Sequence, residues 1–554
     1  MGQVVGLEGT WVRPEDVAEY RRAGYWPGIL LTDRLWEVAK HDPGRVAIVD
    51  SARSATYGEL ADEVVRLAIG LRGLGIGAGD VGIIQLPNWH EFLVFHLALT
   101  ALGALTVNLP PIYREREVRT VARSSGAKLL VVPERFRGFD YTELARTVRA
   151  DASSLEQIFV VRGSGPGCLT YGDFMEWGWE RLRGLDESGA RGREVLESLR
   201  PDPDVVSALG YTSGTTGEPK GAMHTHNALH AINVSVIERY RLTERDRIFM
   251  PSPLGHSLGF THGARLAVYL GATLVLQDVW DPGVAVELIQ RHRCTLTFAA
   301  TPFLQDVVYH SAIERADGLR TLRTFLCGGA PVPEQLLRDA KERLPNTFVS
   351  AYYGITEGGA VTMCPLDAPQ EKIVGSDGKA LLGMQVLIVG PDGEPLPSGA
   401  EGELLIRGPQ NVIGYYQRPD LANAFREDGF FCTGDLARMD SDGYIRITGR
   451  IKELIIRGGV NLAPAEVENI LFEHPKIARV AVLGLPDERL GERVCACVIP
   501  QPNETLTLAE VQEWMARAGA AKQKWPERVE LMTEFPLTAA GKVQKHVLRQ
   551  WIRT

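Results

Sequence analysis

Several features that would place a chain of 554 residues in a familiar class are missing from this sequence. Basic residues are not in excess, because 60 Lys and Arg stand against 69 Asp and Glu, which gives a net charge of −9. A nucleic-acid-binding domain usually carries a basic surface, so the composition argues against that class. It does not exclude a small anionic ligand, because local loops decide whether such a ligand binds.

Cysteine is scarce and shows no paired spacing. An odd number of cysteines without any C-x-x-C pair indicates a reduced protein whose thiols are mostly buried. Two of them alternate with one other residue in "RVCACVIP", the period of a strand, which favours core packing. The seven cysteines are Cys168, Cys294, Cys327, Cys364, Cys432, Cys495 and Cys497.

Long hydrophobic runs are nearly absent as well. The stretch from Phe92 to Leu109 is the one membrane candidate, but it contains His96 and Gly103 and ends at two prolines. These breaks favour a buried helix that runs into a buried strand. No signal peptide is evident, and Gly6 stands where a myristoylation pattern needs Ser or Thr. We therefore expect a cytoplasmic protein without a membrane span.

The length and the apolar periodicity predict α/β structure in at least two domains. Between Ala264 and Tyr353, continuous apolar strands alternate with amphipathic helices, which is typical of parallel βαβ units. Ligands of such sheets bind beyond the carboxyl ends of the strands. Four strand ends carry unusual sequence: "YTSGTTGEPKG" (Tyr211 to Gly221), "ATP" (Ala300 to Pro302), "CGGAP" (Cys327 to Pro331) and "YGITEG" (Tyr353 to Gly358).

The chemistry of these strand ends predicts an ATP site. The first loop has the Gly, Ser, Thr and Lys content of a phosphate loop, but it is not a Walker A loop, because Lys220 follows Pro219. In the other loops, glycines allow a flat ring to approach the backbone, and an aromatic residue can stack on it. A carboxylate there offers a hard oxygen ligand for Mg²⁺. The side chains involved are Ser213, Thr215, Thr216, Lys220, Tyr353, Thr356 and Glu357, with Gly328 and Gly329.

Five motifs in a fixed order give the sequence a specific resemblance. They are "YTSGTTGEPKG", "YGITEG", "TGD" (Thr433 to Asp435), "GRIKELIIRGGVNLAPAEVE" (Gly449 to Glu468) and "PLTAAGKVQK" (Pro536 to Lys545). The chain resembles the adenylate-forming superfamily, which holds acyl-CoA synthetases, firefly luciferase and the adenylation domains of nonribosomal peptide synthetases. Within it, the sequence is most similar to short- and medium-chain acyl-CoA synthetases and cyclohexanecarboxylate-CoA ligases.

The resemblance assigns a role to each matching residue. Tyr353 would stack on adenine, Asp435 would bind the ribose hydroxyls with Arg450 nearby, and Lys542 would neutralise charge between the carboxylate and the α-phosphate. The implied catalytic residues are Lys542, Thr356, Glu357 and His256, with Glu357 holding Mg²⁺. The implied nucleotide, phosphate and CoA contacts are Thr212, Ser213, Gly214, Thr215, Thr216, Lys220, Gly328, Gly329, Ala330, Tyr353, Gly354, Asp435, Arg450, Gly458 and Gly459.

The same resemblance predicts the fold and a moving part. We expect a large N-terminal domain of parallel βαβ sheets with a β-rich subdomain over residues 1–449, and a small mobile α+β domain over residues 450–554. The hinge would be Lys452. One pose of the small domain would bring Lys542 to the site, and the other would bring Gly458 and Gly459 to the path of the incoming thiol. The alternative, purely structural interpretation of these two glycines is a turn that needs positive φ.

The segment Pro253 to Gly263 is expected to line the acid pocket, and Gly259→Trp should shrink the accepted acid if that glycine faces it. The segment lacks the Asn of the 2,3-dihydroxybenzoate-AMP ligases, so an apolar acid, linear or alicyclic, is favoured. The three histidines of "HTHNALH", His224, His226 and His230, could suit a metal, but a capped helix start after the phosphate loop is the better interpretation.

The function predicted from all of this is ATP-dependent ligation of a carboxylic acid to coenzyme A, through an acyl-adenylate, with release of pyrophosphate and AMP. The expected small molecules are the acid, ATP, Mg²⁺ and coenzyme A. Two alternatives stay open from the sequence. The acyl group could be loaded onto an acyl carrier protein, or the enzyme could perform only one half-reaction.

Overall fold

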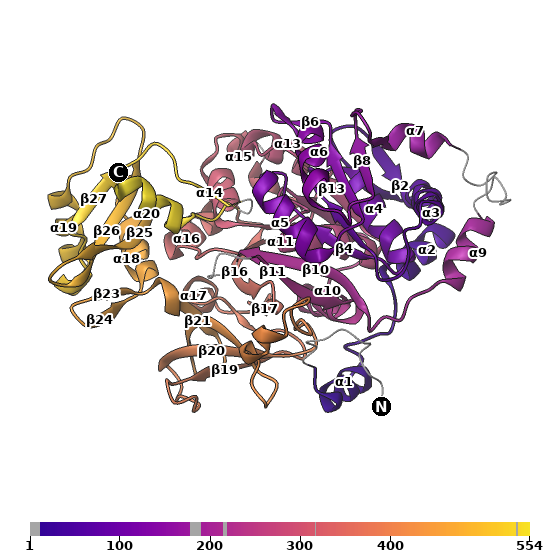
Figure 1. Cartoon of the computed structure of the whole chain (residues 1–554). Helices are drawn as coiled ribbons and strands as arrows, with labels where there is room; N and C mark the ends of the chain where they lie inside the picture. The colour runs from indigo at the N-terminus through magenta and orange to yellow at the C-terminus, as the bar shows by residue number, and fades with distance from the viewer. Residues whose placement is uncertain (1–11, 178–189, 214–218, 316, 539–540, 554) are drawn as a thin grey trace.

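A computed structural model describes residues 12–177, 190–213, 219–315, 317–538 and 541–553 (Figure 1). Two sheets with helices packed on them form the larger part of the molecule, and a smaller sheet domain lies to the left in Figure 1. Mixed α/β structure with a large N-terminal and a small C-terminal domain was the fold predicted from the sequence, and it is confirmed.

The nine-stranded sheet carries the strand ends that the sequence singled out. Six of its strands run parallel, in the spatial order β16, β15, β14, β12, β13, β1. The crossover helices between them cover apolar strands, so the carboxyl ends gather at one edge. Its strands are β1 (Val46–Val49), β2 (Ser54–Thr56), β12 (Arg247–Met250), β13 (Thr273–Leu276), β14 (Leu296–Ala299), β15 (Thr324–Cys327), β16 (Phe348–Ile355), β17 (Gly359–Met363) and β18 (Lys379–Ala380); the helices are α12 (Leu266–Leu270), α13 (Pro282–Arg291), α14 (Thr301–Tyr309) and α16 (Glu334–Arg343).

The second large sheet has seven strands in the order β11-β10-β4-β3-β5-β8-β9. Helix α4 (His90–Ala101) is buried on every side in a core that both large sheets share, and it leads into β4 (Leu105–Asn108). The predicted buried helix and strand are thus confirmed, and no helix of the described chain is long and apolar enough to cross a membrane. The other elements are α3 (Tyr57–Gly73), α5 (Glu115–Ser125), α6 (Tyr141–Asp151), α10 (His226–Tyr240), β3 (Val81–Ile84), β5 (Leu129–Pro133), β8 (Gln157–Val161), β9 (Leu169–Thr170), β10 (Val206–Ser213) and β11 (Pro219–Thr225).

An antiparallel sheet and a mixed sheet follow in the last third of the chain. A four-stranded sheet is the predicted β-rich subdomain: β19 (Gln385–Val389), β20 (Glu401–Arg407), β21 (Phe431–Met439) and β22 (Ile445–Arg450). The short helix η4 (Ile451–Glu453) leads from it to the small domain, which has its own apolar core. That domain contains β23 (Ile455–Arg457), β24 (Val460–Leu462), α18 (Pro464–Phe472), β25 (Ile477–Asp487), β26 (Gly491–Pro500), α19 (Leu508–Arg517), β27 (Arg528–Leu531) and α20 (Lys545–Arg553).

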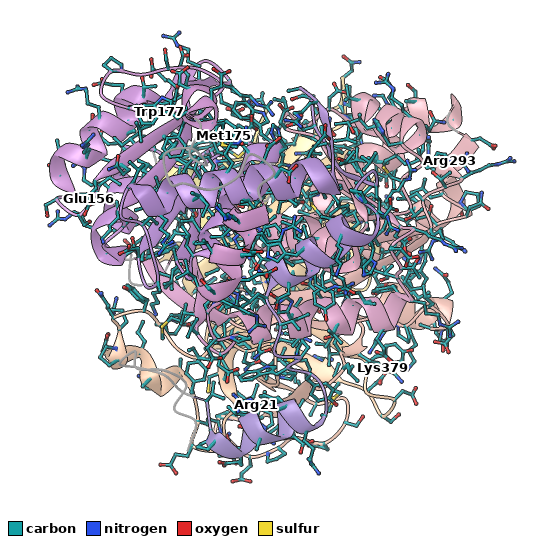
Figure 2. The ribbon with its side chains drawn as sticks, turned by 90° about the vertical axis from the view of Figure 1, so that its right-hand side faces the viewer. Arg21, Glu156, Met175, Trp177, Arg293 and Lys379 are labelled. Carbon is teal, nitrogen blue, oxygen red and sulfur yellow. The ribbon has the colours of Figure 1, made fainter. Side chains whose placement is uncertain are left out.

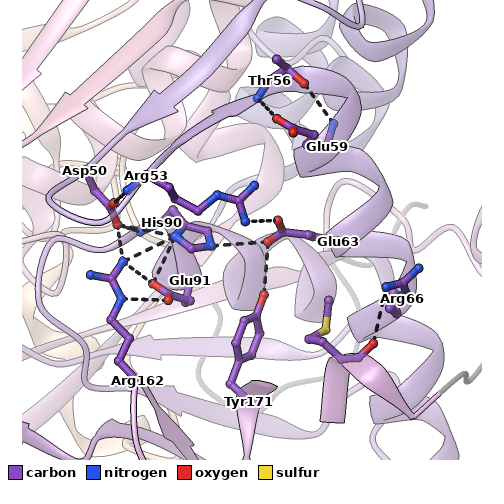
Figure 3. A network of polar contacts seen from close by, with 11 residues as sticks. Asp50, Arg53, Thr56, Glu59, Glu63, Arg66, His90, Glu91, Arg162 and Tyr171 are labelled. Carbon is purple, nitrogen blue, oxygen red and sulfur yellow. Dashed lines mark hydrogen bonds and ion pairs between the residues drawn. The ribbon is translucent and has the colours of Figure 1, made fainter. Parts of the chain in front are cut away.

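An ion network joins the two large sheets (Figure 3). Asp50 follows β1 of one sheet, and Arg162 follows β8 of the other and bonds both Asp50 and Glu91, with 2.9 Å from Nε to Glu91 Oε1. His90 Nε2 lies 3.4 Å from Glu63 Oε2. Burial lowers the pKa of His90, but hydrogen bonds to Asp50 and Glu63 outweigh it and raise the pKa to about 9. Asp50, His90 and Glu91 form the one three-donor group suited to a metal within the described ranges, and there the Arg162 guanidinium supplies the cation.

Candidate functional site

Tyr353, Asp435 and Arg450 meet at the carboxyl edge of the nine-stranded sheet. The Tyr353 hydroxyl donates to Asp435 Oδ2 over 2.6 Å, and Arg450 Nε donates to Asp435 Oδ1 over 2.6 Å. Burial raises the pKa of Tyr353, and the neighbouring Asp435 raises it further. The pairing of β21 with β22 places Asp435 opposite Arg450, so the two residues are held in register by backbone hydrogen bonds. Three of the predicted nucleotide contacts therefore lie together.

Glu357 and Lys220 share one aromatic partner, Tyr415. The Tyr415 hydroxyl donates to Glu357 Oε1 over 2.9 Å, and Lys220 Nζ lies 5.7 Å from the centre of the Tyr415 ring. Desolvation raises the pKa of Glu357, against the hydrogen bond from Tyr415. A carboxylate beside a lysine of the phosphate-loop strand β11 is suited to a hard cation that also touches phosphate.

The loop after β15 differs in detail from the expectation. Gly329 has φ of +81°, a conformation that favours glycine. A Cβ on Gly328 would lie 2.5 Å from Tyr352 Cε1, so the Tyr352 ring is the group that requires glycine at this position. Gly354 is constrained in the same way, because its Cβ would lie 2.5 Å from the carbonyl oxygen of Gly359. Thr301 fixes the loop by donating to the carbonyl of Pro331 over 3.1 Å.

Lys542 reaches this region from the small domain. It follows Gly541, which has φ of +78° and packs against Pro302 at the start of α14. Burial lowers the pKa of Lys542, Arg450 lowers it further, and Glu453 and Asp435 oppose both. Burial, followed by the charge of Lys542, lowers the pKa of His256 to about 4. The lysine of the small domain and the histidine of the large domain thus lie in one electrostatic environment.

Other predicted residues lie apart from this centre or beyond the described chain. Gly214, Thr215 and Thr216 lie outside the described residues, as do the side chains of Thr212 and Ser213 at the end of β10. Gly458 and Gly459 join β23 to β24 with φ of +58° and +81°, the signature of a two-residue type I′ hairpin turn. The turn alone accounts for both glycines. This was the structural alternative to a role in the path of the thiol.

The segment predicted to line the acid pocket is an irregular helix. Residues Phe260–Arg265 form the π-helix η1, a rare form that is frequent at functional sites. Gly259 faces away from any pocket, because its Cβ would lie 2.3 Å from the carbonyl oxygen of Pro253. The prediction for Gly259→Trp required this glycine to face the acid pocket, and the structure does not meet that condition. His262 instead stacks on Phe298 at 4.3 Å between ring centres and meets the Tyr352 ring edge-on at 5.7 Å.

The histidines of "HTHNALH" belong to the interior of the fold. Thr225 caps α10 by accepting a hydrogen bond from the backbone N–H of Ala228, as the helix-start interpretation predicted. His224, His226 and His230 are all buried, and no metal-binding group of the described residues contains them.

Tyr415 and Tyr352 were not among the predicted site residues. Tyr415 comes to the site because it bridges to Ala222 of β11, from nearly two hundred positions away in the chain. Nothing local in the sequence signals that pairing. Tyr352 stands directly before the expected Tyr353, and strand alternation would have placed it on the opposite face, toward the acid segment.

Comparisons with known proteins agree with this geometry. The family model "AMP-binding enzyme" matches residues 35–416, and "AMP-binding enzyme C-terminal domain" matches residues 466–542. A medium-chain fatty-acid–CoA ligase of Escherichia coli is 37% identical, over 96% of this chain and 92% of its own length. A 2,3-dihydroxybenzoate-AMP ligase of Bacillus subtilis is 34% identical, over 99% of this chain and 98% of its own.

Solved structures give the same result. ATP-bound MatB from Rhodopseudomonas palustris superposes with a TM-score of 0.81 at 26% identity, over 95% of this chain and 99% of that one. An anthranilate CoA ligase in complex with anthranoyl-AMP matches in fold, with a TM-score of 0.82 at 23% identity, over 95% and 97% of the two chains. The chain belongs to the family of AMP-binding enzymes, the ATP-dependent, AMP-forming ligases.

Proposed function

We propose that this enzyme converts an apolar carboxylic acid and ATP into an acyl-adenylate, and then transfers the acyl group to coenzyme A. The observation that carries the proposal is the position of Lys542. Its side chain is half-buried where the small domain meets the large one, and it affects the pKa of His256 while Arg450 and Asp435 affect its own. A cation delivered by one domain to a partly buried centre of the other suits a step in which negative charge develops.

In the first half-reaction, an oxygen of the substrate carboxylate would attack the α-phosphorus of ATP. The new P–O bond replaces the bond to the oxygen bridging the β-phosphate, and pyrophosphate leaves with that electron pair. Lys542 would offset the charge shared by the carboxylate and the α-phosphate. Tyr353, Asp435 and Arg450 would hold the adenosine, and Thr356 would contact the α-phosphate. Glu357 would hold Mg²⁺, which supplies charge neutralisation on the phosphates.

In the second half-reaction, the sulfur of coenzyme A would attack the acyl carbon of the adenylate. The C–S bond forms, the C–O bond to phosphate breaks, and AMP leaves with the electron pair while the thiol proton passes to water. For this step we propose that residues 450–554 rotate about Lys452 as one domain. The hairpin turn at Gly458 and Gly459 would then border the path of the thiol.

The aromatic walls behind the centre support an apolar acid. His262, Phe298 and Tyr352 are buried against one another, and burial lowers the pKa of His262 to about 3, so its imidazole is neutral. Thr261 is satisfied internally, because its hydroxyl donates to the Ser257 carbonyl. The relative described as a medium-chain fatty-acid–CoA ligase supports both the apolar acid and coenzyme A as acceptor.

Half-reactions measured separately test the function. Pyrophosphate exchange with a panel of linear and alicyclic acids reports adenylation, and thioester yield with coenzyme A or an acyl carrier protein reports transfer. Lys542→Met should lower adenylation by about 10²–10³, the effect of losing one preorganised electrostatic donor. Thioester formation from supplied acyl-adenylate should largely survive.

The control is Lys522→Met, which removes an exposed lysine of the same domain. It should leave both half-reactions unchanged. Equal loss of both half-reactions in Lys542→Met would contradict the role assigned to Lys542. Transfer to a carrier protein in preference to coenzyme A would overturn the proposed acceptor while leaving the adenylation step intact.

A further inference from the structure

A buried arginine without an acidic partner lies behind the reaction centre. Arg265 ends the π-helix η1, and its side chain has no exposed surface. Around it are His96 of α4, His226 and His230 of α10, and the ring of Phe260 at 5.7 Å. Within the described part of the chain, no carboxylate forms an ion pair with Arg265. A lone buried cation of this kind is costly unless something compensates its charge.

The one hydrogen-bond partner that Arg265 has among the described residues cannot provide that compensation. Arg265 Nη1 lies 3.3 Å from His96 Nε2, and a guanidinium only donates, so Nε2 must carry the lone pair. The proton of His96 then sits on Nδ1 and points to Thr106 Oγ1 at 3.3 Å, and Thr106 donates on to the carbonyl of Ser207. His96, Thr106 and the Ser207 carbonyl are all neutral. This row of hydrogen bonds therefore orients Arg265 without balancing its charge.

Several polar atoms at this place have no protein partner. Arg265 Nε and Nη2 find no acceptor among the described residues, and neither His226 Nδ1 nor Asn233 Oδ1 has a partner there. Leaving a buried donor of a charged group unsatisfied costs about 1–3 kcal/mol or more. Buried polar groups in folded proteins are nearly always paired, with protein, water or a ligand. Two guanidinium nitrogens, Nε with one N–H and Nη2 with two, and an imidazole nitrogen are therefore available to a ligand.

The histidines cannot supply the missing negative charge, and they do not add positive charge. Burial and the charge of Arg265 lower the pKa of His96 well below its usual range, and the pKa of His226 falls to about 3 for the same reasons. Burial lowers the pKa of Arg265 to about 9, against a small opposing effect of Tyr269. Arg265 is therefore still a cation at neutral pH, and it is surrounded by neutral groups.

This cluster is separate from the aromatic walls of the acid pocket, although it lies near the reaction centre. His262 and Arg265 belong to the same π-helix, but His262 contacts Phe298 and Tyr352 whereas Arg265 contacts His96. Arg265 also lowers the pKa of His224. The Nε2 atom of His224 and the methyl group of Thr356 both lie close to Gly210. The cluster thus borders the residue proposed to contact the α-phosphate.

We propose that Arg265 and His226 bind a small monoanion in the interior of the enzyme, between α4, η1 and α10. The ligand is a halide-sized ion or a carboxylate, because both accept from the N–H groups of the two unpaired guanidinium nitrogens and from an imidazole N–H. It has two conceivable sources: a free inorganic anion such as chloride, or a second carboxylate at the far end of the acid substrate. The second source would widen the acid class beyond the apolar acids proposed above.

Bromide identifies a free anion directly. Crystals of the wild-type enzyme transferred to sodium bromide should show an anomalous bromine peak beside the Arg265 guanidinium. The thermal midpoint should also rise by a few degrees when sodium gluconate is replaced by sodium chloride at equal ionic strength, because an anion that binds only the folded state stabilises it. Arg265→Met, of similar length and without charge, should lose both effects.

Two variants control for unrelated consequences of the substitution. Arg293→Met removes an exposed arginine, visible at the periphery in Figure 2, and should keep the chloride dependence. Arg265→Lys retains the positive charge and should keep part of the chloride dependence. If Arg265→Met does not fold, the bromide peak and chloride response of the wild-type enzyme still decide the question.

The substrate source is tested by pyrophosphate exchange with monocarboxylic and α,ω-dicarboxylic acids of equal length. A distal carboxylate on Arg265 predicts a preference for the diacid of about tenfold or more, which Arg265→Met abolishes. This arm rests on the proposed function, whereas the bromide and stability arms do not, so the two can fail separately. Absence of the bromide peak, of the chloride response and of the diacid preference would mean that Arg265 is solvated by water alone, and would overturn the anion site.

Discussion

Tyr352 is the side chain that we expect to limit the size of the proposed acid pocket. Tyr352 lies across Gly328, with 2.5 Å between its Cε1 and the position of a Cβ there, and its ring meets both His262 and Phe298 edge-on. Tyr352→Ala should let the enzyme accept longer acids, because removing the ring opens space next to the aromatic walls. We expect kcat/KM for acids beyond the wild-type length limit to rise by about tenfold or more, as one or more methylenes gain a place to bind.

The measurement is pyrophosphate exchange across a series of linear acids. Tyr352→Phe is the matched control, because it removes only the hydroxyl and should leave the length limit where it is. Tyr352→Ala should also lower the thermal midpoint, since truncating a buried aromatic residue costs about 3–5 kcal/mol. A stable alanine variant with an unaltered length profile would remove Tyr352 from the acid pocket.

The contribution of individual residues was predictable only where local sequence carries the role. Tyr353, Asp435 and Arg450 stand in recognisable motifs, and the structure brings them within hydrogen-bond distance. Tyr415 has no such motif, because its place depends on a bridge between distant segments. Arg265 was also missed, since the sequence around a charged residue gives no sign of whether that residue will find a partner.

At the scale of elements, the hairpin of β23 and β24 separates a turn requirement from a functional one. Gly459→Leu would force a side chain into φ of +81° and would strain the turn whatever the glycine does. Gly458→Asn is the better test, because Asn tolerates the left-handed conformation at φ of +58° and suits the first position of a type I′ turn. It adds a side chain with little strain.

If the turn borders the path of the thiol, Gly458→Asn should lower CoA thioester yield while pyrophosphate exchange and the thermal midpoint stay near wild type. If the glycine serves only the turn, all three should be unchanged. Gly459→Leu provides the comparison for strain. A side chain in this disfavoured backbone region should lower the free energy of unfolding by about 1–3 kcal/mol, and the thermal midpoint should fall with it.

The ion network between the two large sheets predicts a pH-dependent stability. The pKa of His90 is raised to about 9 in the folded protein, against about 6.5 in the unfolded chain. Its contribution is therefore complete below pH 6.5 and is lost as the pH rises through 9. The size of the shift corresponds to about 3 kcal/mol. Asp50 and Glu63 have lowered pKa values, so they stay ionised across this window and add no slope.

Thermal midpoints from pH 6 to pH 10 for the wild-type protein and His90→Gln test this. The difference between the two should be largest near pH 6, should shrink as the pH rises from 6.5 to 9, and should be nearly gone at pH 10. His41→Gln is the control, because His41 is exposed at the end of helix α2 (Leu31–His41). A constant difference across the range would show that His90 acts by packing and not by charge.

At the scale of the whole molecule, the succession of elements was predictable and the relative placement of the domains was not. Periodic apolar strands between Thr273 and Ile355 specify a parallel sheet, because only strands buried on both faces read that way. The position of the small domain depends instead on a few contacts between distant segments: Phe472 of α18 packs against the apolar core of the large domain, and polar contacts lie beside it. Gln305 Nε2 donates to the Ala478 carbonyl over 2.9 Å, and Arg479 pairs with Asp306 at 2.9 Å. Contacts this sparse leave no periodic signal in a sequence.

These contacts hold the pose in which Lys542 reaches the large domain, so weakening them should affect one half-reaction more than the other. Arg479→Glu would set two carboxylates against each other at Asp306 and would favour rotation away from this pose. An exposed ion pair contributes up to about 1 kcal/mol, and reversing one charge adds a repulsion of similar size. We expect adenylation to fall by about five- to thirtyfold, with thioester formation from supplied acyl-adenylate unchanged or faster. Arg517→Glu, an equal charge reversal on the outer helix α19, should alter neither step. Parallel loss of both steps in Arg479→Glu, at an unchanged thermal midpoint, would mean that the small domain does not alternate between two poses.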